Sequence, residues 1–332
     1  MICTTTDLPM PRGYLCRRAP EPPPLDGRLS AGVWARATWT KPFRDIEGDR
    51  RPEPPLRTRA KMLWDDQCLY IAAELEEPNV WGTLTEHDCV IFQDNDFELF
   101  IDPDGDHHNY FELEFNALNT LWDLRLPKPY RDGGPALNEW EATGIRSAVH
   151  VDGKINDPTV RDKGWVIEIA IPWTAFAEHG GARCPPRSGD LWRMNFSRVE
   201  WDVNVVDGRT IKIPNRPEHN WVWSPQGVVD MHRPERWGMV RFTDEPPGRG
   251  RFRPDPAQRT RDLLMRVYEA QRSYRGEHGK WASSLEELGA RLEPATAGAV
   301  TLEPRAGGWV ARRRGSGARW AVTEDGRFAN TK

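Results

Sequence analysis

The chain has 332 residues, of which 38% are hydrophobic and 29% are charged, and its net charge is −4. This length allows two domains with buried cores, and the composition is that of a globular protein rather than a disordered one. Residues 247–332 hold 17 Lys and Arg against 10 Asp and Glu, so the preceding part is strongly acidic, which argues against nucleic acid as its ligand.

The cysteines and the N-terminus exclude several further classes. The five cysteines include no Cys-x-x-Cys pair, so the sequence predicts neither a disulfide framework nor a zinc site. Residues 1–18 contain no apolar run suited to a signal peptide, and no segment approaches the roughly 20 apolar residues of a membrane helix. We therefore expect no membrane span and, from the sequence as written, a cytoplasmic protein; a start farther upstream would allow export and an extracellular location.

The first segments of the chain predict an extended entry and one hairpin. Residues 1–24 end in a proline-rich run and are expected to form an N-terminal extension. Residues 58–63 and 68–75 alternate between apolar and other side chains on either side of the turn 64–67, which predicts two paired strands. Residues 76–93 are expected to form a long connection.

The segment 94–123 is the central feature of the sequence. Two alternating stretches flank a turn containing Pro103 and Gly105, which predicts a β-hairpin. One face is apolar and includes Leu99 and Leu113. The other face combines acids, an amide and aromatic rings, namely Glu98, Phe100, Tyr110, Glu112, Glu114 and Asn116. Such a mixture suits a ligand rich in hydroxyl groups.

The remainder predicts a β-sandwich followed by a second domain. Strands are expected near 147–151, 164–171, 191–199 and 239–242, with loops at 124–160 and 200–220. The fold class is mainly β: an antiparallel sandwich, immunoglobulin- or jelly-roll-like, over residues 25–244. Residues 245–255 are expected to be a linker. In 256–332 a helix to residue 276, a capped helix at 283–289 and three short strands predict a small α+β domain.

Several of these segments together resemble the carbohydrate-binding module family 9-like proteins of bacteria over about residues 14–243. The matching stretches are 25–27 with Trp34, 62–66, 94–106 with its continuation to 123, 164–173, 195–201 and 220–238. The resemblance implies a β-sandwich, sugar binding in carbohydrate catabolism, structural calcium in some members and no catalytic centre. The tail is similar, around 268–288, to the soluble part of type IV pilin-like or pseudopilin-like domains, without the hydrophobic helix that assembles pili.

The residues themselves supply candidates for a sugar site, which needs aromatic faces for C–H groups beside polar groups for hydroxyls. The candidate polar contacts are Glu98, Tyr110, Glu112, Glu114, Asn116 and Arg198. The candidate stacking rings are Trp81, Trp122, Trp221 and Trp223. Trp221 and Trp223 would share one face of a strand, whereas Trp165 and Trp192 lie on apolar faces and are expected in the core.

The acidic residues also suggest calcium, for which Asp94, Asp96 and Asp102 are the candidate ligands, because hard cations prefer clustered oxygen atoms. The loop is not an EF-hand, since Leu113 occupies the twelfth position counted from Asp102, where an EF-hand has Glu. The alternative is a turn whose Asp side chains bond to neighbouring backbone. No other cofactor is expected.

We therefore expect non-catalytic carbohydrate binding in a glycan-degradation context, with a saccharide or polysaccharide as the partner. Two alternatives remain open. One is a glycoside-processing enzyme that uses Glu112 and Glu114, whose backbones would lie roughly 6.6 Å apart along one strand. The other is a structural or assembly protein in which the sandwich is a spacer and the basic C-terminal domain binds another protein.

Overall fold

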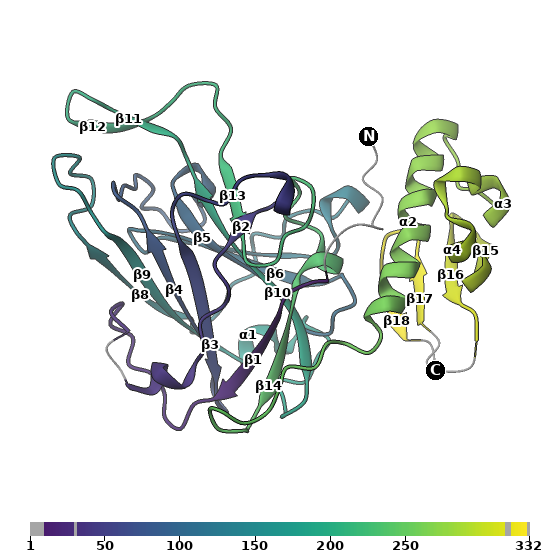
Figure 1. Ribbon diagram of the computed structural model, residues 1–332, viewed down its shortest axis with the longest axis horizontal. Coiled ribbons are helices and arrows are strands. Elements are labelled where there is room, and N and C mark those ends of the chain that lie inside the picture. Colours follow the sequence, from purple (N-terminus) through teal and green to yellow (C-terminus); the bar gives the residue numbers. More distant parts are fainter. Residues whose placement is uncertain (1–9, 30–31, 316–319, 331–332) are drawn as a thin grey trace.

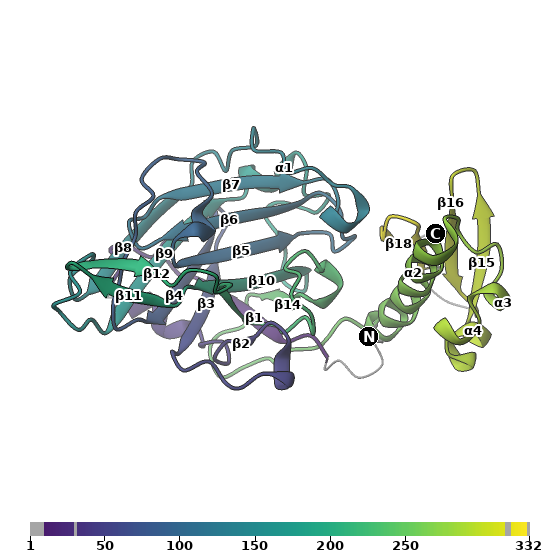
Figure 2. The ribbon, with the colours of Figure 1, turned by 90° about the horizontal axis from the view of Figure 1, so that it is seen from above.

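The computed structural model describes residues 10–29, 32–315 and 320–330, and shows a large β-rich body beside a small α+β domain (Figure 1). The body contains one curled sheet in the order β7-β6-β5-β10-β14-β1-β3-β4-β9-β8. Seen from above, its strands form two layers (Figure 2). The strands of this path are β1 Gly13–Arg18, β3 Thr58–Trp64, β4 Cys68–Glu76, β5 Asp96–Asp102, β6 Tyr110–Asn116, β7 Leu121–Leu126, β8 Arg146–Asp152, β9 Gly164–Pro172, β10 Leu191–Glu200 and β14 Gly238–Thr243.

The predicted hairpins are confirmed. Strands β3 and β4 pair antiparallel with Met62 opposite Ile71, and β5 and β6 pair with Leu99 opposite Leu113. The apolar faces of both layers meet in one core, as period-two alternation requires. The single helical turn predicted after the strand at 164–171 is present as α1 (Thr174–Ala177).

The N-terminal segment differs from the expectation. Residues 13–18 belong to the sheet as β1, with Tyr14 and Cys16 buried, rather than to an extension outside the sandwich. Strand β1 runs parallel to both β14 and β3, so the sheet is mixed and not purely antiparallel. Parallel strands are distant in sequence and are not joined by a tight turn, so the local sequence pattern does not reveal their pairing.

The loop expected at 200–220 is also partly regular. It contains the hairpin β11 (Val203–Val206) and β12 (Arg209–Lys212) and the start of β13 (His219–Val222), which pairs with β10 and with β2 (Arg44–Asp45). Asp207 and Gly208 at the hairpin turn both have positive φ, as a two-residue type I′ turn requires. The Asp-Gly pair was therefore the available sequence signal.

The tail forms a second core of its own. Its elements are α2 Gln258–His278, α3 Leu285–Leu288, α4 Pro294–Ala299, β15 Val300–Arg305, β16 Gly308–Arg313, β17 Trp320–Thr323 and β18 Phe328–Asn330. The predicted helices and three strands are confirmed, and α4 and β18 add to them. Helix α2 packs its apolar side on this sheet, with Leu264 and Val322 in the shared core. None of the helices in the described residues is long and apolar enough to cross a lipid bilayer.

Residues 245–255 follow the sandwich closely. The Arg17 guanidinium donates to the carbonyl oxygens of Glu245, Pro246 and Arg249 at 2.7–2.8 Å. Asp255, at the end of this segment, pairs with Arg193 of β10 and Arg261 of α2 at 3.0 Å. These contacts fix the connection between the two domains.

The cap of α3 gives a first prediction. Ser284 is the N-cap residue, and its hydroxyl accepts a hydrogen bond from the backbone N–H of Glu287. Replacing Ser284 with Ala removes this acceptor, and we expect the tail to lose about 1 kcal/mol of stability. Denaturant unfolding followed by circular dichroism would measure the loss, and Ser284→Asp, which restores an acceptor, should recover most of it.

Candidate functional site

A pocket of about 280 Å³ opens over the polar face of strands β5, β6 and β7. The register of these strands places Glu98 opposite Glu114, and Glu114 opposite Trp122, so these three side chains stand in a row across the sheet. Glu112, two residues before Glu114, points to the same face. Loops complete the pocket, and the lining residues from them include Phe92, Tyr130, Glu218, Asn220, Asp230 and His232.

The floor of this pocket is acidic and buried. Glu98, Glu112 and Glu114 are no more than 5% exposed, and Asp96 beneath them is fully buried. Burial raises the pKa of Glu98 to about 7, and it raises the pKa values of Asp96, Glu112 and Glu114 well above their ordinary range. The carboxyl groups can therefore share protons near neutral pH and both donate and accept hydrogen bonds.

The raised pKa of Glu98 predicts how its contribution to stability depends on pH. Between its unfolded pKa near 4.5 and its folded pKa near 7, the folded state holds a proton that the unfolded state has lost, so stability falls as pH rises through this window. Because the amide of Glu98→Gln cannot titrate, the variant should take up fewer protons on folding, by up to about one proton per molecule. Denaturant unfolding from pH 5 to pH 8 should show a shallower decline for the variant; equal slopes would contradict the raised pKa.

Aromatic rings form the walls of the pocket. Phe92 and Trp122 lie side by side with ring centroids 6.4 Å apart, and Trp122 Nε1 donates to Asn138 Oδ1 at 3.2 Å. Across the pocket, Tyr130 meets His232 edge to face at 4.4 Å. Burial lowers the pKa of His232 to about 3, so this ring is neutral at physiological pH.

The structure brings only some of the predicted ligand residues to the pocket. Glu98, Glu112, Glu114 and Trp122 line it. Tyr110 is buried behind it, with its hydroxyl 2.9 Å from His232 Nδ1.

Two further predicted contacts are used inside the protein. The Asn116 side chain donates to the Leu84 carbonyl oxygen at 2.8 Å and to Asp94. Arg198 is 1% exposed and forms ion pairs with Glu77 and Glu200 at 2.8 and 2.7 Å. The polar groups of Asn116 and Arg198 are bonded to other parts of the protein and are not directed at the pocket.

The remaining tryptophans require a correction. Trp223 is 1% exposed and packs against Tyr14 and Phe196, so neither face of its ring is open to a ligand. Trp81 is also buried, at 5%. Alternation places Trp221 and Trp223 on the same face, as predicted, but that face is directed at the core.

Trp221 nevertheless borders a second, larger hollow of about 680 Å³. This hollow adjoins the first, because Ile46, Glu218, Asn220 and Val229 line both. Trp221 itself is 4% exposed and carries the Arg198 guanidinium over its ring at 5.2 Å. Trp122 therefore lines one hollow and Trp221 lines its neighbour.

The three predicted calcium ligands do not form one cluster among the described residues. Asp94 accepts hydrogen bonds from the N–H groups of Thr83 and Leu84. Asp102 accepts from the N–H groups of Gly105 and His107, which is the backbone-bonded turn named as the alternative.

Asp96 instead groups with Glu98 and Glu114, and Asp102 groups with Asp104 and Asp106. A third group that sequence reasoning missed joins His87 to Asp88 and Asp123, with His87 Nε2 at 3.4 and 3.6 Å from their carboxylates. Its members come from a loop and from β7, so only the fold reveals it.

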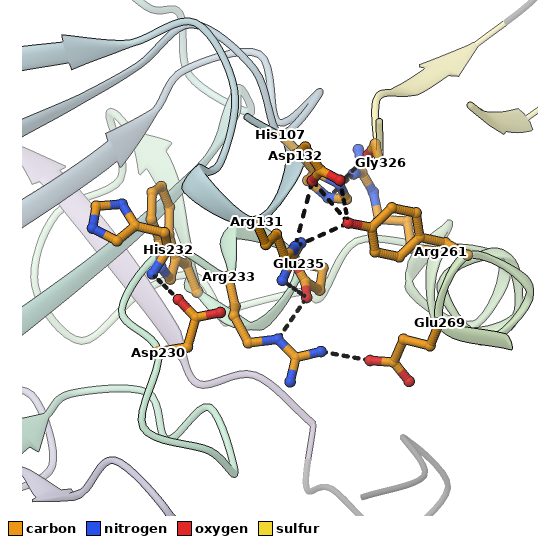
Figure 3. Close-up of polar contacts among 12 residues, drawn as sticks. His107, Arg131, Asp132, Asp230, His232, Arg233, Glu235, Arg261, Glu269 and Gly326 are labelled. Carbon is orange, nitrogen blue, oxygen red and sulfur yellow. Dashed lines mark hydrogen bonds and ion pairs between the residues drawn. The ribbon is translucent and has the colours of Figure 1, made fainter. Parts of the chain in front are cut away.

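Helix α2 of the tail holds the rim of the pocket. Tyr130 and His232 of the rim are followed in sequence by Arg131 and Arg233, whose guanidinium groups turn towards the tail (Figure 3). Arg131 donates two hydrogen bonds to Glu235 at 3.0 and 2.8 Å. The side chains of the two rim segments are therefore tied to each other.

The same residues reach the helix. Arg233 forms an ion pair with Glu269 of α2 (Figure 3). The Tyr268 hydroxyl of the same helix donates to Asp132 at 2.7 Å. Although burial acts in the opposite direction, the charges of Arg131 and Arg233 lower the pKa of Glu235 well below its ordinary range. We call Arg131, Asp132, Arg233, Glu235, Tyr268 and Glu269 the interdomain network.

Comparison with known proteins gives a family and distant relatives. The profile of the family described as carbohydrate family 9 binding domain-like matches residues 25–243. The exoglucanase XynX of Acetivibrio thermocellus is 26% identical over 116 residues, which are 35% of this chain and 9% of that protein. The endo-1,4-beta-xylanase A of Thermoanaerobacterium saccharolyticum is 25% identical over 121 residues, 36% of this chain and 9% of that protein. The chain thus spans about a tenth of the length of these relatives.

A solved structure with low sequence identity shares the fold. A crystal structure of a Bacteroides uniformis protein assigned as carbohydrate-binding covers 70% of this chain and 99% of its own, with a TM-score of 0.52 and 16% identity. A carbohydrate binding module family 9 from Caldicellulosiruptor kristjanssonii, in complex with cellotriose, covers 73% of this chain and 100% of its own, with a TM-score of 0.46 and 14% identity.

Proposed function

The chain belongs to the carbohydrate family 9 binding domain-like family, and on this basis we propose that it binds a saccharide in the pocket over β5–β7 without cleaving it. One observation carries the assignment to this pocket. The carboxylates of Glu98 and Glu114 and the ring of Trp122 stand in register across three strands, where they can bind hydroxyl groups and a sugar face together. The pocket of about 280 Å³ is at the lower end of the size of ligand sites, which suits a single sugar unit.

We place this binding in a glycan-degradation context. The two curated relatives bear the names of an exoglucanase and a xylanase, and the matching part is a small fraction of each. A small binding unit in such proteins keeps an enzyme close to its polymeric substrate by raising its effective concentration. The proposed role of this chain is therefore the recognition of a polysaccharide, in company with enzymes that act on it.

The family favours binding over catalysis, because it is a family of binding domains. Glycosidases hold two carboxyl groups roughly 5–9 Å apart on either side of the bond that is cleaved. Glu112 and Glu114 lie two residues apart on the same face of β6, and this backbone spacing by itself would allow such a pair. The preference for binding therefore rests on the family and on the ring of Trp122 beside the acids.

The basic residues of the tail contact the sandwich. Part of its positive charge is used within the chain, because Arg261 donates to the Gly105 carbonyl oxygen at 2.6 Å, Arg272 pairs with Asp132 and Arg327 pairs with Asp106. We propose that the tail stabilises the pocket rim through the contacts of the interdomain network. This role needs neither fibre assembly nor a second protein.

A glycan array with the full chain tests the proposed function. We expect retention of a restricted set of glycans and no release of reducing sugar on incubation with them. Sugar release that is abolished by Glu112→Gln would replace binding with hydrolysis as the function. Failure to retain any glycan, together with capture of another protein through the tail, would favour the assembly alternative.

A further inference from the structure

Acidic side chains gather at the floor of the pocket, where Glu98 and Glu114 line it and the fully buried Asp96 lies beneath them. One carboxylate oxygen from each of Asp96, Glu98 and Glu114 lies within 4.8 Å of the other two. All three residues are at most 4% exposed. Carboxylates this close repel one another when they are ionised. Burial also removes the water that would stabilise their charged forms.

Two of these acids have oxygens left without a partner. Asp96 Oδ1 accepts from the backbone N–H of Val199 at 3.1 Å, and Glu114 Oε2 accepts from that of Phe92 at 3.0 Å. Asp96 Oδ2 and Glu98 Oε2, by contrast, have no hydrogen-bond partner among the described residues. Buried acceptors are almost always paired in folded proteins, and Glu98 lines the pocket, so its unpaired oxygen points to a ligand that supplies donors.

No basic side chain compensates for this charge within the pocket. The described residues that line it include neither Lys nor Arg, and its one histidine is neutral because burial lowers the pKa of His232 to about 3. Two acids from the loops, Glu218 and Asp230, line the pocket as well. The lining therefore holds several acids and no cation, and a bound cation would favour the ionised form of these acids.

We propose that the preferred ligand is a saccharide with a free, positively charged amine, of which a hexosamine unit is the simplest case. This inference rests on the proposed function and specifies the class of sugar. A primary ammonium group has three N–H donors, and acceptors at roughly 2.8 Å from its nitrogen stand about 4.6 Å apart. The carboxylate oxygens of Glu98, Glu114 and the underlying Asp96 lie within 4.8 Å of one another, an upper limit that includes this spacing.

The walls favour an organic cation over a bare metal ion. Calcium is bound by oxygen ligands alone and gains nothing from aromatic rings. Phe92, Trp122 and Tyr130 offer ring faces and edges on which a sugar can pack and which attract a cation. Acids below and aromatic rings at the sides together suit an ammonium group carried on a sugar ring.

Isothermal titration calorimetry of the full chain tests this inference with D-glucosamine and N-acetyl-D-glucosamine, and with chitosan and chitin oligosaccharides of equal length. Acetylation removes the charge and keeps the ring. We expect the amine forms to bind at least tenfold more tightly at pH 6.5, and Glu98→Gln to reduce this preference to less than threefold. Glu178→Gln, an exposed acid outside the pocket, should leave the preference unchanged.

The other outcomes are distinct. Equal affinity for amine and acetylated forms, or tighter binding of D-glucose and cello-oligosaccharides, overturns the inference and leaves the proposed function intact. Calcium chloride that binds alone and displaces D-glucosamine overturns it in favour of a metal site. Binding of no saccharide at all overturns both, and thermal unfolding of Glu98→Gln shows whether that variant is folded.

Discussion

Glu235→Ala should destabilise the protein by about 3–5 kcal/mol, because removing one partner of a buried ion pair leaves the other charge uncompensated. Glu235 is 5% exposed and receives two hydrogen bonds from Arg131 and one from Arg233, so its loss affects two guanidinium groups at once. Denaturant unfolding at pH 7 would measure the change.

The same variant should bind glycans more weakly. Arg131 and Arg233 adjoin the rim residues Tyr130 and His232, whose rings meet at 4.4 Å, and a rim that loses its anchor is no longer held in the binding arrangement. The matched control is Glu277→Ala on helix α2, which breaks the exposed pair with Arg291 and should change neither stability nor affinity appreciably. Full stability and full affinity of Glu235→Ala would show that the interdomain network does not support the pocket.

Trp122→Ala should reduce glycan affinity by roughly thirtyfold, which corresponds to about 2 kcal/mol, as expected for a tryptophan that supplies a central contact. Trp122 is partly exposed on β7, lines the pocket and lies beside Phe92. The fold should persist, because its ring is outside the buried part of the core.

Trp39→Ala is the matched control for that loss. Trp39 is likewise partly exposed, but it packs under Arg59 and Lys61, each 4.2 Å from its ring, and does not line the pocket. Its replacement should leave glycan binding unchanged. If both variants lost affinity equally, the effect would come from general destabilisation rather than from a sugar contact.

Local pattern was sufficient for the elements whose partners are close in sequence. Alternation in β5 and β6 predicts both the hairpin and the face on which Glu98 and Glu114 stand, and the structure has the same pairing. Ser284 and Gly289 predict where α3 begins and ends. Each of these features depends on residues within a few positions of one another.

The sequence could not supply what depends on distant packing. Trp221 and Trp223 share a face, but only the curled sheet decides that this face is directed at the core, where Trp223 meets Tyr14 and Phe196. The pocket walls Tyr130 and His232 lie in loops about a hundred residues apart and meet because the interdomain network brings their segments together. Periodicity carries no information on such contacts.

The tail illustrates the same limit. Its helix and strands are predicted by pattern and capping residues, whereas its docking on the sandwich depends on partly buried pairs such as Arg233 with Glu269. Arginine and glutamate at these positions look like an ordinary solvated helix face in the sequence. Only their burial shows that they join two domains.

Calorimetric titration of the full chain and of Trp122→Ala with the best glycan from the array tests the central claim most directly. We expect saturable binding by the wild type, and in the variant an affinity lower by roughly thirtyfold with an unchanged melting temperature. Wild-type affinity in Trp122→Ala would contradict the assignment of the saccharide to the pocket over β5–β7.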